Sequence, residues 1–182
     1  MANHVTSRVE IKCNEAAQVL VDQWITAVDA LDDEEHKMVW NLMENIPDEI
    51  TYEWTTDNIG TKWCYVEEIY DKTFVLVSAW DCPIKFTDWL SEQILAIDED
   101  ASIIVTYEDD GANFTGYHVY TSLGVRSDYI DYDDLVALTE QRITELVDLN
   151  PDGDDYFDML QENIFDTIYT WQDEQVAKTE GN

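Results

Sequence analysis

The 182-residue sequence predicts an α+β fold: an antiparallel sheet with packed helices, extended by a C-terminal acidic helical hairpin. Two observations predict it. Segments with strand-like alternation take turns with segments whose apolar residues recur at helical spacing, and the C-terminal part changes to helical patterns dense in acids. The length fits one domain with an appendage. We therefore expect an α+β body over residues 1–126 and, packed on it, a hairpin over residues 127–182.

The body begins with a strand at residues 5–13 (VTSRVEIKC), where side chains alternate in polarity. Asn14 is a typical helix N-cap, and it precedes a helical pattern that continues to about residue 31. The apolar positions of that pattern are Ala17, Leu20, Val21, Trp24, Ile25 and Val28. Four acids at 32–35 then predict the first turn of a second short helix, ended by Pro47.

The second half of the body predicts two hairpins around a helix. The strand-like runs KWCYVEEIY and TFVLVSAW are split at Asp71-Lys72, and a loop, TTDNIG, precedes them. Pro83 lies at the favoured start of a helix that carries apolar residues to Leu95. SIIVTYE, the turn DDGAN and FTGYHVYTSLG predict the second hairpin.

Charge is the dominant feature of the composition. The chain has 41 acidic and 9 basic residues, a net charge of −32, together with 45% hydrophobic and 12% aromatic residues. Acidic disordered tails lack such aromatic content, so we expect the chain to fold despite its self-repulsion. So few cations cannot neutralise a run of phosphates, which excludes direct binding to nucleic acid or anionic membranes through a basic surface.

The sequence also predicts a compartment. It opens without a signal-peptide pattern, and no apolar window is long enough to span a bilayer. Cys13, Cys64 and Cys82 are odd in number and widely spaced, which is typical of reduced thiols in a cytoplasmic protein, here in the cytoplasm of a host cell. No cofactor or metal site is expected from the cysteines and histidines.

Four segments resemble the YubB-type ferredoxin-like domain family of conjugative plasmids and phages. They are MANHVTSRVEI at residues 1–11, NIGTKW at 58–63, VSAWDCP at 77–83 and YEDDGANFTGYHVY at 107–120. The resemblance covers about residues 1–120 and leaves the acidic tail outside. It implies a split βαβ sheet packed by helices and an origin on a mobile element, but no agreed activity.

The acidic tail carries the functional hypothesis. Residues 127–182 hold 16 acids and two bases, and they predict helices over DDLVALTEQRITELVDL and over Tyr156 to about Lys178. On the last helix an apolar stripe of Phe157, Leu160, Ile164, Ile168 and Trp171 must face the body. Carboxylates lie opposite, with no base in reach for ion pairs. We expect the phosphate-mimicking residues to be Asp131, Asp133, Asp134, Glu140, Glu145, Asp155, Asp158, Glu162, Asp166, Asp173 and Glu174.

These observations predict a phage or mobile-element DNA mimic. It would bind a basic nucleic-acid-binding host protein, such as a restriction, CRISPR or other defence nuclease, through carboxylates that take the place of phosphates. Tyr129, Tyr132, Tyr156 and Tyr169 could add aromatic contacts. The alternative is a non-mimetic acidic accessory or scaffold protein of halophilic or marine background. A homodimer is compatible with either.

Other sites are weighed against simpler explanations. Asp148, Asn150, Asp152 and Asp154 match the first half of an EF-hand loop, but Met159 stands where a bidentate Glu is needed, so a plain turn is favoured over weak cation binding. Asp81 is the best candidate for a partly buried acid, and Cys82 lacks a neighbouring His. No catalytic motif is present, and an enzyme is not expected.

Overall fold

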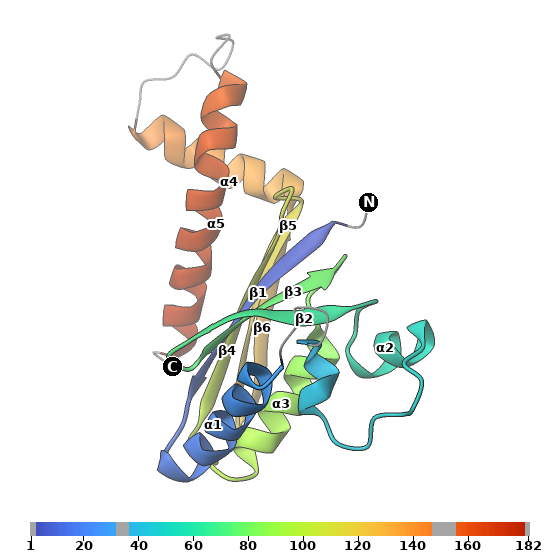
Figure 1. Ribbon diagram of the computed structural model, residues 1–182. Helices are drawn as coiled ribbons and strands as arrows, with labels where there is room; N and C mark the ends of the chain where they lie inside the picture. Colours follow the sequence, from blue (N-terminus) through green and yellow to red (C-terminus); the bar gives the residue numbers. More distant parts are fainter. Residues whose placement is uncertain (1–2, 32–36, 147–155, 181–182) are drawn as a thin grey trace.

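The computed structural model describes residues 3–31, 37–146 and 156–180 (Figure 1). Its strands are β1 (His4–Lys12), β2 (Cys64–Tyr70), β3 (Thr73–Ala79), β4 (Ser102–Asp109), β5 (Phe114–Thr121) and β6 (Gly124–Asp131). Its helices are α1 (Glu15–Asp29), the 3₁₀ helix η2 (Val39–Leu42), α2 (Tyr52–Asn58), α3 (Ile84–Leu95), α4 (Tyr132–Leu146) and α5 (Tyr156–Glu180).

The strands form one antiparallel sheet in the order β2-β3-β1-β4-β5-β6. β1 lies at its centre and pairs with β3 on one side and with β4 on the other. The hairpins β2–β3 and β4–β5 and the strand β6 extend the sheet outward. The expected α+β fold with an antiparallel sheet and packed helices is therefore confirmed.

Helices cover both faces of the sheet (Figure 1). On one face α1 and α3 build the larger core, in which Trp24, Phe86 and Leu90 pack with the buried strand residues Val9 and Ile103. Asn14 caps α1 as predicted, because its side chain accepts from Ala16 and Ala17 N–H groups.

On the opposite face, α5 crosses β4 and β5. Trp171 packs on Ile104 and Tyr117 of the sheet, and Ile164 and Ile168 form a further cluster with Leu135 of α4. Gln172 adds a buried polar link, donating to the Tyr107 carbonyl at 3.1 Å and to Thr115 Oγ1 at 2.8 Å. The predicted apolar stripe of the last helix is therefore confirmed for its members from Leu160 onward, while the side chain of Phe157 lies outside the described part.

Three local expectations were wrong. The strand β6 was not predicted, and it crosses residue 126, so the expected boundary between body and hairpin falls inside a strand. The second short helix, expected to start at residues 32–35 and to end before Pro47, is wrong in its described part, where only Val39–Leu42 form the 3₁₀ turn η2; residues 32–36 lie outside the described residues. The expected loop TTDNIG is mostly helical, because α2 continues to Asn58.

The cysteines agree with the expectation of reduced thiols. Cys64 and Cys82 are buried, Cys13 is half-buried, and all three are free. Among the helices that the structure describes, none combines the length and the apolar character that crossing a membrane requires.

Candidate functional site

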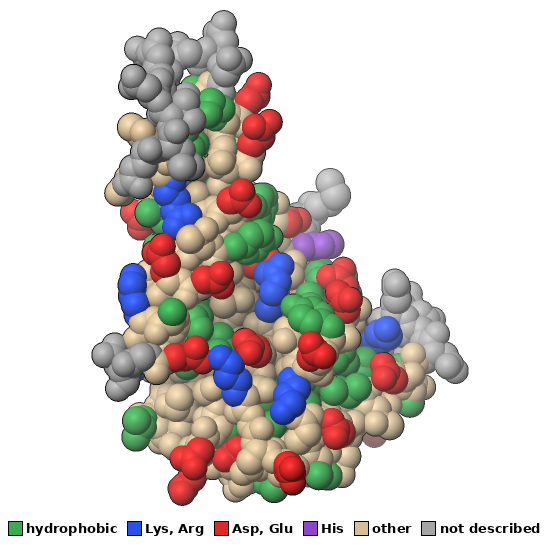
Figure 2. Space-filling model, turned by 90° about the vertical axis from the view of Figure 1, so that its left-hand side faces the viewer, with side chains coloured by type: hydrophobic (Ala, Val, Ile, Leu, Met, Phe, Trp, Pro, Cys, Tyr) green, Lys and Arg blue, Asp and Glu red, His purple; other side chains and the backbone are tan. Residues whose placement is uncertain are grey.

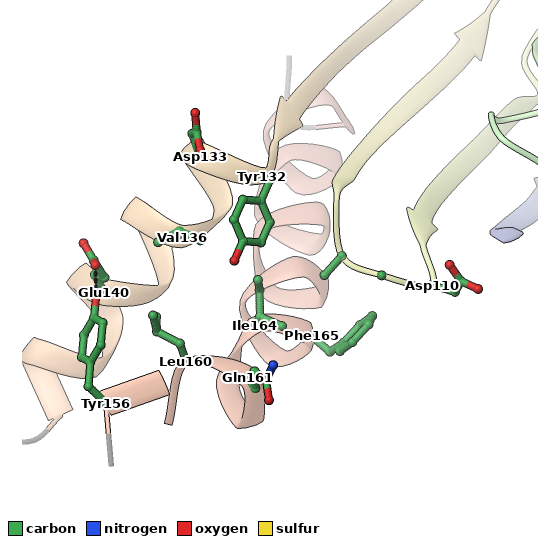
Figure 3. Close-up of a pocket in the computed structure, with 12 residues that line it drawn as sticks. Asp110, Tyr132, Asp133, Val136, Glu140, Tyr156, Leu160, Gln161, Ile164 and Phe165 are labelled. Atoms are coloured by element: carbon green, nitrogen blue, oxygen red, sulfur yellow. Dashed lines mark hydrogen bonds between the residues drawn. The ribbon is translucent and has the colours of Figure 1, made fainter. Parts of the chain in front are cut away.

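A groove lies between α4 and α5 on the acidic part of the molecule (Figure 3). Its volume is about 520 Å³, and its floor is apolar, with Val136, Leu160 and Ile164 pointing inward from the two helices. Periodicity explains this floor, because Leu160 and Ile164 belong to the same stripe that docks α5 on the sheet. We call this cavity the α4–α5 groove.

Carboxylates line the rim of the α4–α5 groove. They come from the β4–β5 turn and from α4, as Asp110, Asp133 and Glu140. Tyr132 extends its ring between the two helices, and the Tyr156 hydroxyl is hydrogen-bonded to the Glu140 carboxylate (Figure 3). An apolar floor with an acidic rim suits a chain segment that is apolar at its centre and basic at its edges.

Four of the predicted carboxylates follow one side of α5. Asp158, Glu162, Asp166 and Asp173 are exposed, and none forms an ion pair with a described residue. At about 1.5 Å per residue the first three are about 6 Å apart, and the whole set extends over about 22 Å. At 100° per residue they fall within about 80° of the helix circumference. We call these four residues the α5 row.

The other predicted acids have different surroundings. Glu174 lies on another side of α5, where Arg142 Nη2 of α4 bonds to it at 3.3 Å. Asp131 caps α4, since its Oδ1 accepts from the Asp134 N–H at 3.2 Å. The structure therefore does not align Asp131, Asp134 and Glu174 with the α5 row. The Glu145 side chain and Asp155 lie outside the described residues, as does the EF-hand-like turn with Asp148, Asn150, Asp152 and Asp154.

Basic side chains contact α5 at several points. Lys12 Nζ bonds to Glu180 at 2.6 Å, Arg126 to the Thr179 carbonyl at 3.4 Å, and Arg8 lies over the Tyr169 ring at 5.3 Å from its centre. Figure 2 shows the consequence, because on this face carboxylates alternate with lysine and arginine instead of forming one uninterrupted acidic surface. On this face the α5 row is distinguished by the lack of ion pairs to described residues, not by a concentration of all acids there.

The charge density of the α5 row is lower than that of DNA. A duplex has one charge per about 1.7 Å and a single strand one per about 3.4 Å, or about 13 and about 6–7 charges over the same 22 Å. The four row carboxylates fall short of both numbers, and the three rim carboxylates lie on other elements, not along this line. The duplex number is not reached by these residues.

Sequence reasoning missed the buried acids. Asp81, the expected candidate, is exposed, whereas Asp98, Glu108 and Asp109 are buried. Burial raises the pKa of Glu108, and the nearby Arg8 guanidinium opposes that rise. Asp109 instead organises the β4–β5 turn, since its Oδ2 accepts from the Gly111 N–H at 2.9 Å. A strand-end acid followed by a Gly-containing turn is the only sequence signal for that role.

The described part of the chain supports neither a nucleophilic cysteine nor a metal site. Burial raises the pKa of the Cys82 thiol, and the charges of Asp81 and Asp88 raise it further, so the thiol stays protonated. The described residues contain no cluster of three or more His, Cys, Asp or Glu side chains that could hold a metal ion.

Comparison of the chain with protein-family models, with curated proteins and with solved structures found no match. The functional argument therefore depends on the geometry and charge described above.

Proposed function

We propose that this chain is a phage or mobile-element protein that imitates nucleic acid and thereby occupies the DNA-binding surface of a basic host defence protein. The observation that carries the proposal is the α5 row, four exposed carboxylates that form no ion pair with a described residue, on a helix packed on the sheet beside an acid-rimmed groove. Solubility requires a net charge of only about 2–8 in a small domain, so −32 calls for another benefit.

The interaction would follow ordinary electrostatic recognition. The negative field steers a basic surface toward α5, and lysine and arginine side chains then pair with the row carboxylates. An apolar side chain of the partner fits the floor of the α4–α5 groove, at Val136 and Leu160, while neighbouring basic groups meet Asp133 and Glu140. Exposed rings at Tyr132, half exposed, and Tyr169, two-fifths exposed, add contact area.

We also propose that the segment β1-α1-β2-β3-α3-β4 is a ferredoxin-like unit related to YubB-type domains. The strand order β2-β3-β1-β4 within the sheet, with helices in both connections, supports this. The resemblance segments 58–63 and 77–83 also lie side by side, since the Thr61 hydroxyl bonds to the Ala79 carbonyl. This assignment adds an origin on a mobile element and no activity.

The proposed function is tested by measuring binding to the partner and competition by DNA. The partner captured from host lysate at low salt should be released by excess DNA and by rising salt. Changing Glu162, Asp166 and Asp173 together to lysine should weaken binding by more than about tenfold, because each reversal replaces an attraction with a repulsion. The matched control reverses three exposed acids on α1, α2 and α3, Asp29, Asp57 and Glu92. Circular dichroism checks that both variants fold.

Two outcomes oppose the proposal. If the row variant binds as tightly as the parent chain, the α5 row is not the binding face. If DNA at saturating concentration leaves the complex intact, the partner is not held through its nucleic-acid surface.

A second candidate function is favoured by one specific observation. Exposed acids also cover the helices on the other side of the sheet, where α1 and α3 carry Glu15, Asp22, Asp88 and Glu92. A widely acidic exterior is what an acidic accessory or scaffold protein of a halophilic or marine background would show. That function predicts an unfolding temperature that rises steeply with salt, and equal, weak effects of the two triple variants on any binding.

A further inference from the structure

A second pocket lies on the opposite face of the sheet from the α4–α5 groove. Its volume is about 460 Å³, and aromatic rings form most of its wall, namely Trp80, Tyr107, Phe114 and Tyr129. Asp81 and His118 supply its polar groups together with the tyrosine hydroxyls. We call it the aromatic pocket.

Three segments build the aromatic pocket. They are the stretch at residues 80–84 after β3, the hairpin β4–β5 and the strand β6 with Tyr129. Trp80 has φ at +72°, a left-handed conformation that is strained for a bulky residue. This conformation is fixed in part by the Trp80 N–H, which donates to the Asn3 carbonyl at 3.0 Å. The outcome is a large indole that is 48% exposed at the pocket mouth.

The hairpin β4–β5 supplies the rest of the wall. Gly116 lies opposite Tyr107, and any Cβ at that position would come within 2.2 Å of the Tyr107 hydroxyl. The missing side chain lets the Tyr107 ring lie on the sheet and stack with His118, with centroids 5.5 Å apart and planes at 18°. Phe114 continues the wall to Tyr129, at 5.8 Å between centroids.

Asp81 is the exposed polar group of the aromatic pocket, whereas His118 lies deeper in it. Among the described residues, His118 Nδ1 is buried without a hydrogen-bond partner. Burial lowers the pKa of His118, so its imidazole is neutral at physiological pH and a ring nitrogen can accept a hydrogen bond. Asp81 is exposed and forms no ion pair with a described residue, while its Oδ1 accepts from the Cys82 N–H at 2.8 Å.

The pocket favours a cation over an anion. The amino end of α3, which could attract an anion, is partly satisfied, because the Phe86 N–H donates to the Ile59 carbonyl at 3.2 Å. Burial raises the pKa of Tyr129, and the negative charges of Asp131 and Asp81 raise it further. These two charges indicate a negative potential at the pocket mouth. The chain already makes one cation–π contact at this site, with Lys62 Nζ 5.4 Å from the Trp80 ring centre.

We propose that the aromatic pocket binds a guanidinium group, supplied by an arginine side chain of a peptide or protein. A guanidinium is flat, so it stacks on aromatic rings, and its N–H donors can pair with the exposed Asp81 carboxylate. An ammonium would use the rings less well, and a neutral heterocycle could donate to the carboxylate only without the gain from opposite charge. The site is separate from the α5 row, and its test does not depend on the proposed function.

The probe is the blocked tripeptide acetyl-Gly-Arg-Gly-amide, followed by NMR of the Trp80 indole N–H and the His118 ring protons in the full chain. Titration to millimolar concentrations should shift both sets of resonances in a saturable way. The citrulline tripeptide, which has the same shape without charge, should bind at least about threefold more weakly, and free arginine should compete at similar strength if the guanidinium alone is recognised.

Substitutions in the aromatic pocket test whether the arginine peptide binds there. Asp81→Asn should weaken the arginine peptide about threefold, and Trp80→Leu about fivefold, through the lost charge and the lost cation–π contact. Asp100→Asn is the matched control, because Asp100 is an exposed acid beyond the other end of α3, and it should leave binding unchanged. Equal binding of the citrulline and arginine peptides would overturn the proposal, as would unshifted Trp80 and His118 resonances.

Discussion

Replacing Arg8 by methionine should destabilise the protein by leaving a buried carboxylate without its counter-charge. Arg8 Nη1 bonds to both oxygens of Glu108, at 2.6 and 2.9 Å. The Glu108 side chain is only 5% exposed, while that of Arg8 is 33% exposed. Methionine keeps much of the packing volume against Tyr169 and removes the charge, so the variant isolates the electrostatic term.

The magnitude follows from the burial of the two partners. Removing one partner of a fully buried pair costs about 3–5 kcal/mol, and the partial exposure of Arg8 reduces this to about 2–3 kcal/mol at pH 7. For a chain of this size that corresponds to a fall of about 5–10 °C in Tm. Glu108→Gln should cost less, about 1 kcal/mol, because the unpaired guanidinium that remains can reach solvent.

The pH dependence gives a signature that packing loss would not produce. Burial raises the pKa of Glu108 above its unfolded value, and loss of Arg8 removes the main opposing influence. A group whose folded pKa is raised favours the folded state below its unfolded pKa and loses that effect as pH rises through the folded pKa. The defect of Arg8→Met should therefore be small near pH 4 and grow toward pH 7.

Urea unfolding of the parent, both single variants and the double variant Arg8→Met/Glu108→Gln measures these terms in one double-mutant cycle. The double variant should recover most of the stability that Arg8→Met loses, because it removes the buried charge altogether. A loss below about 0.5 kcal/mol in Arg8→Met, or a loss that is equal at pH 4 and pH 7, would refute the reasoning.

Two further predictions concern the packing of the fold. Ile168→Ala should lower the free energy of unfolding by about 3 kcal/mol, because the Ile168 side chain of α5 is completely buried. The control Val19→Ala changes a side chain that is 57% exposed and should alter the free energy of unfolding by less than about 0.5 kcal/mol. Equal losses in urea unfolding would contradict the docking of α5. A thiol reagent applied to the native protein should label Cys13 first, because Cys64 and Cys82 are buried and burial raises the pKa of both; mass spectrometry that finds Cys82 labelled first would contradict that burial.

Periodicity explains why so much of the fold could be predicted from sequence. The apolar stripe of α5 and the alternation of β1 are local patterns, and each sets which face is buried. β6 lacks such a pattern, since nearly all of its residues are exposed. It forms because the backbone of β5 has an edge that can pair with another strand. Backbone hydrogen bonds do not require a particular side-chain pattern, so the sequence does not reveal this strand. The 3₁₀ turn η2 shows a related ambiguity, because buried Val39 and Leu42 are three residues apart, a spacing that fits either helix type.

The candidate site could be predicted where its residues share one helix, and could not be predicted where they come from different elements. The α5 row could be derived from helical spacing alone, because its members share one helix. Glu174 falls outside that row for the same reason, since it is turned by 100° from Asp173, but its ion pair with Arg142 of α4 could not be derived from spacing. The groove rim likewise depends on Asp110 of a turn in the body. Contacts between distant elements decide both features, and sequence spacing carries no information on them.

The distribution of the basic residues bears on the choice between mimicry and a generally acidic exterior. Arg8, Lys12, Arg126 and Arg142, four of nine bases in the chain, contact α5 or a residue on it. These contacts lie where α5 meets the sheet and α4, so they hold the helix in place without reaching the outward α5 row. A general need for an acidic exterior does not by itself explain why one side of a packed helix carries four acids without an ion pair to a described residue. Under the proposed mimicry such a row would suit a partner of fixed geometry, because a preorganised surface loses little entropy on binding. The row variant and its matched control on α1, α2 and α3 separate these two explanations, since they carry the same change in charge and differ only in position.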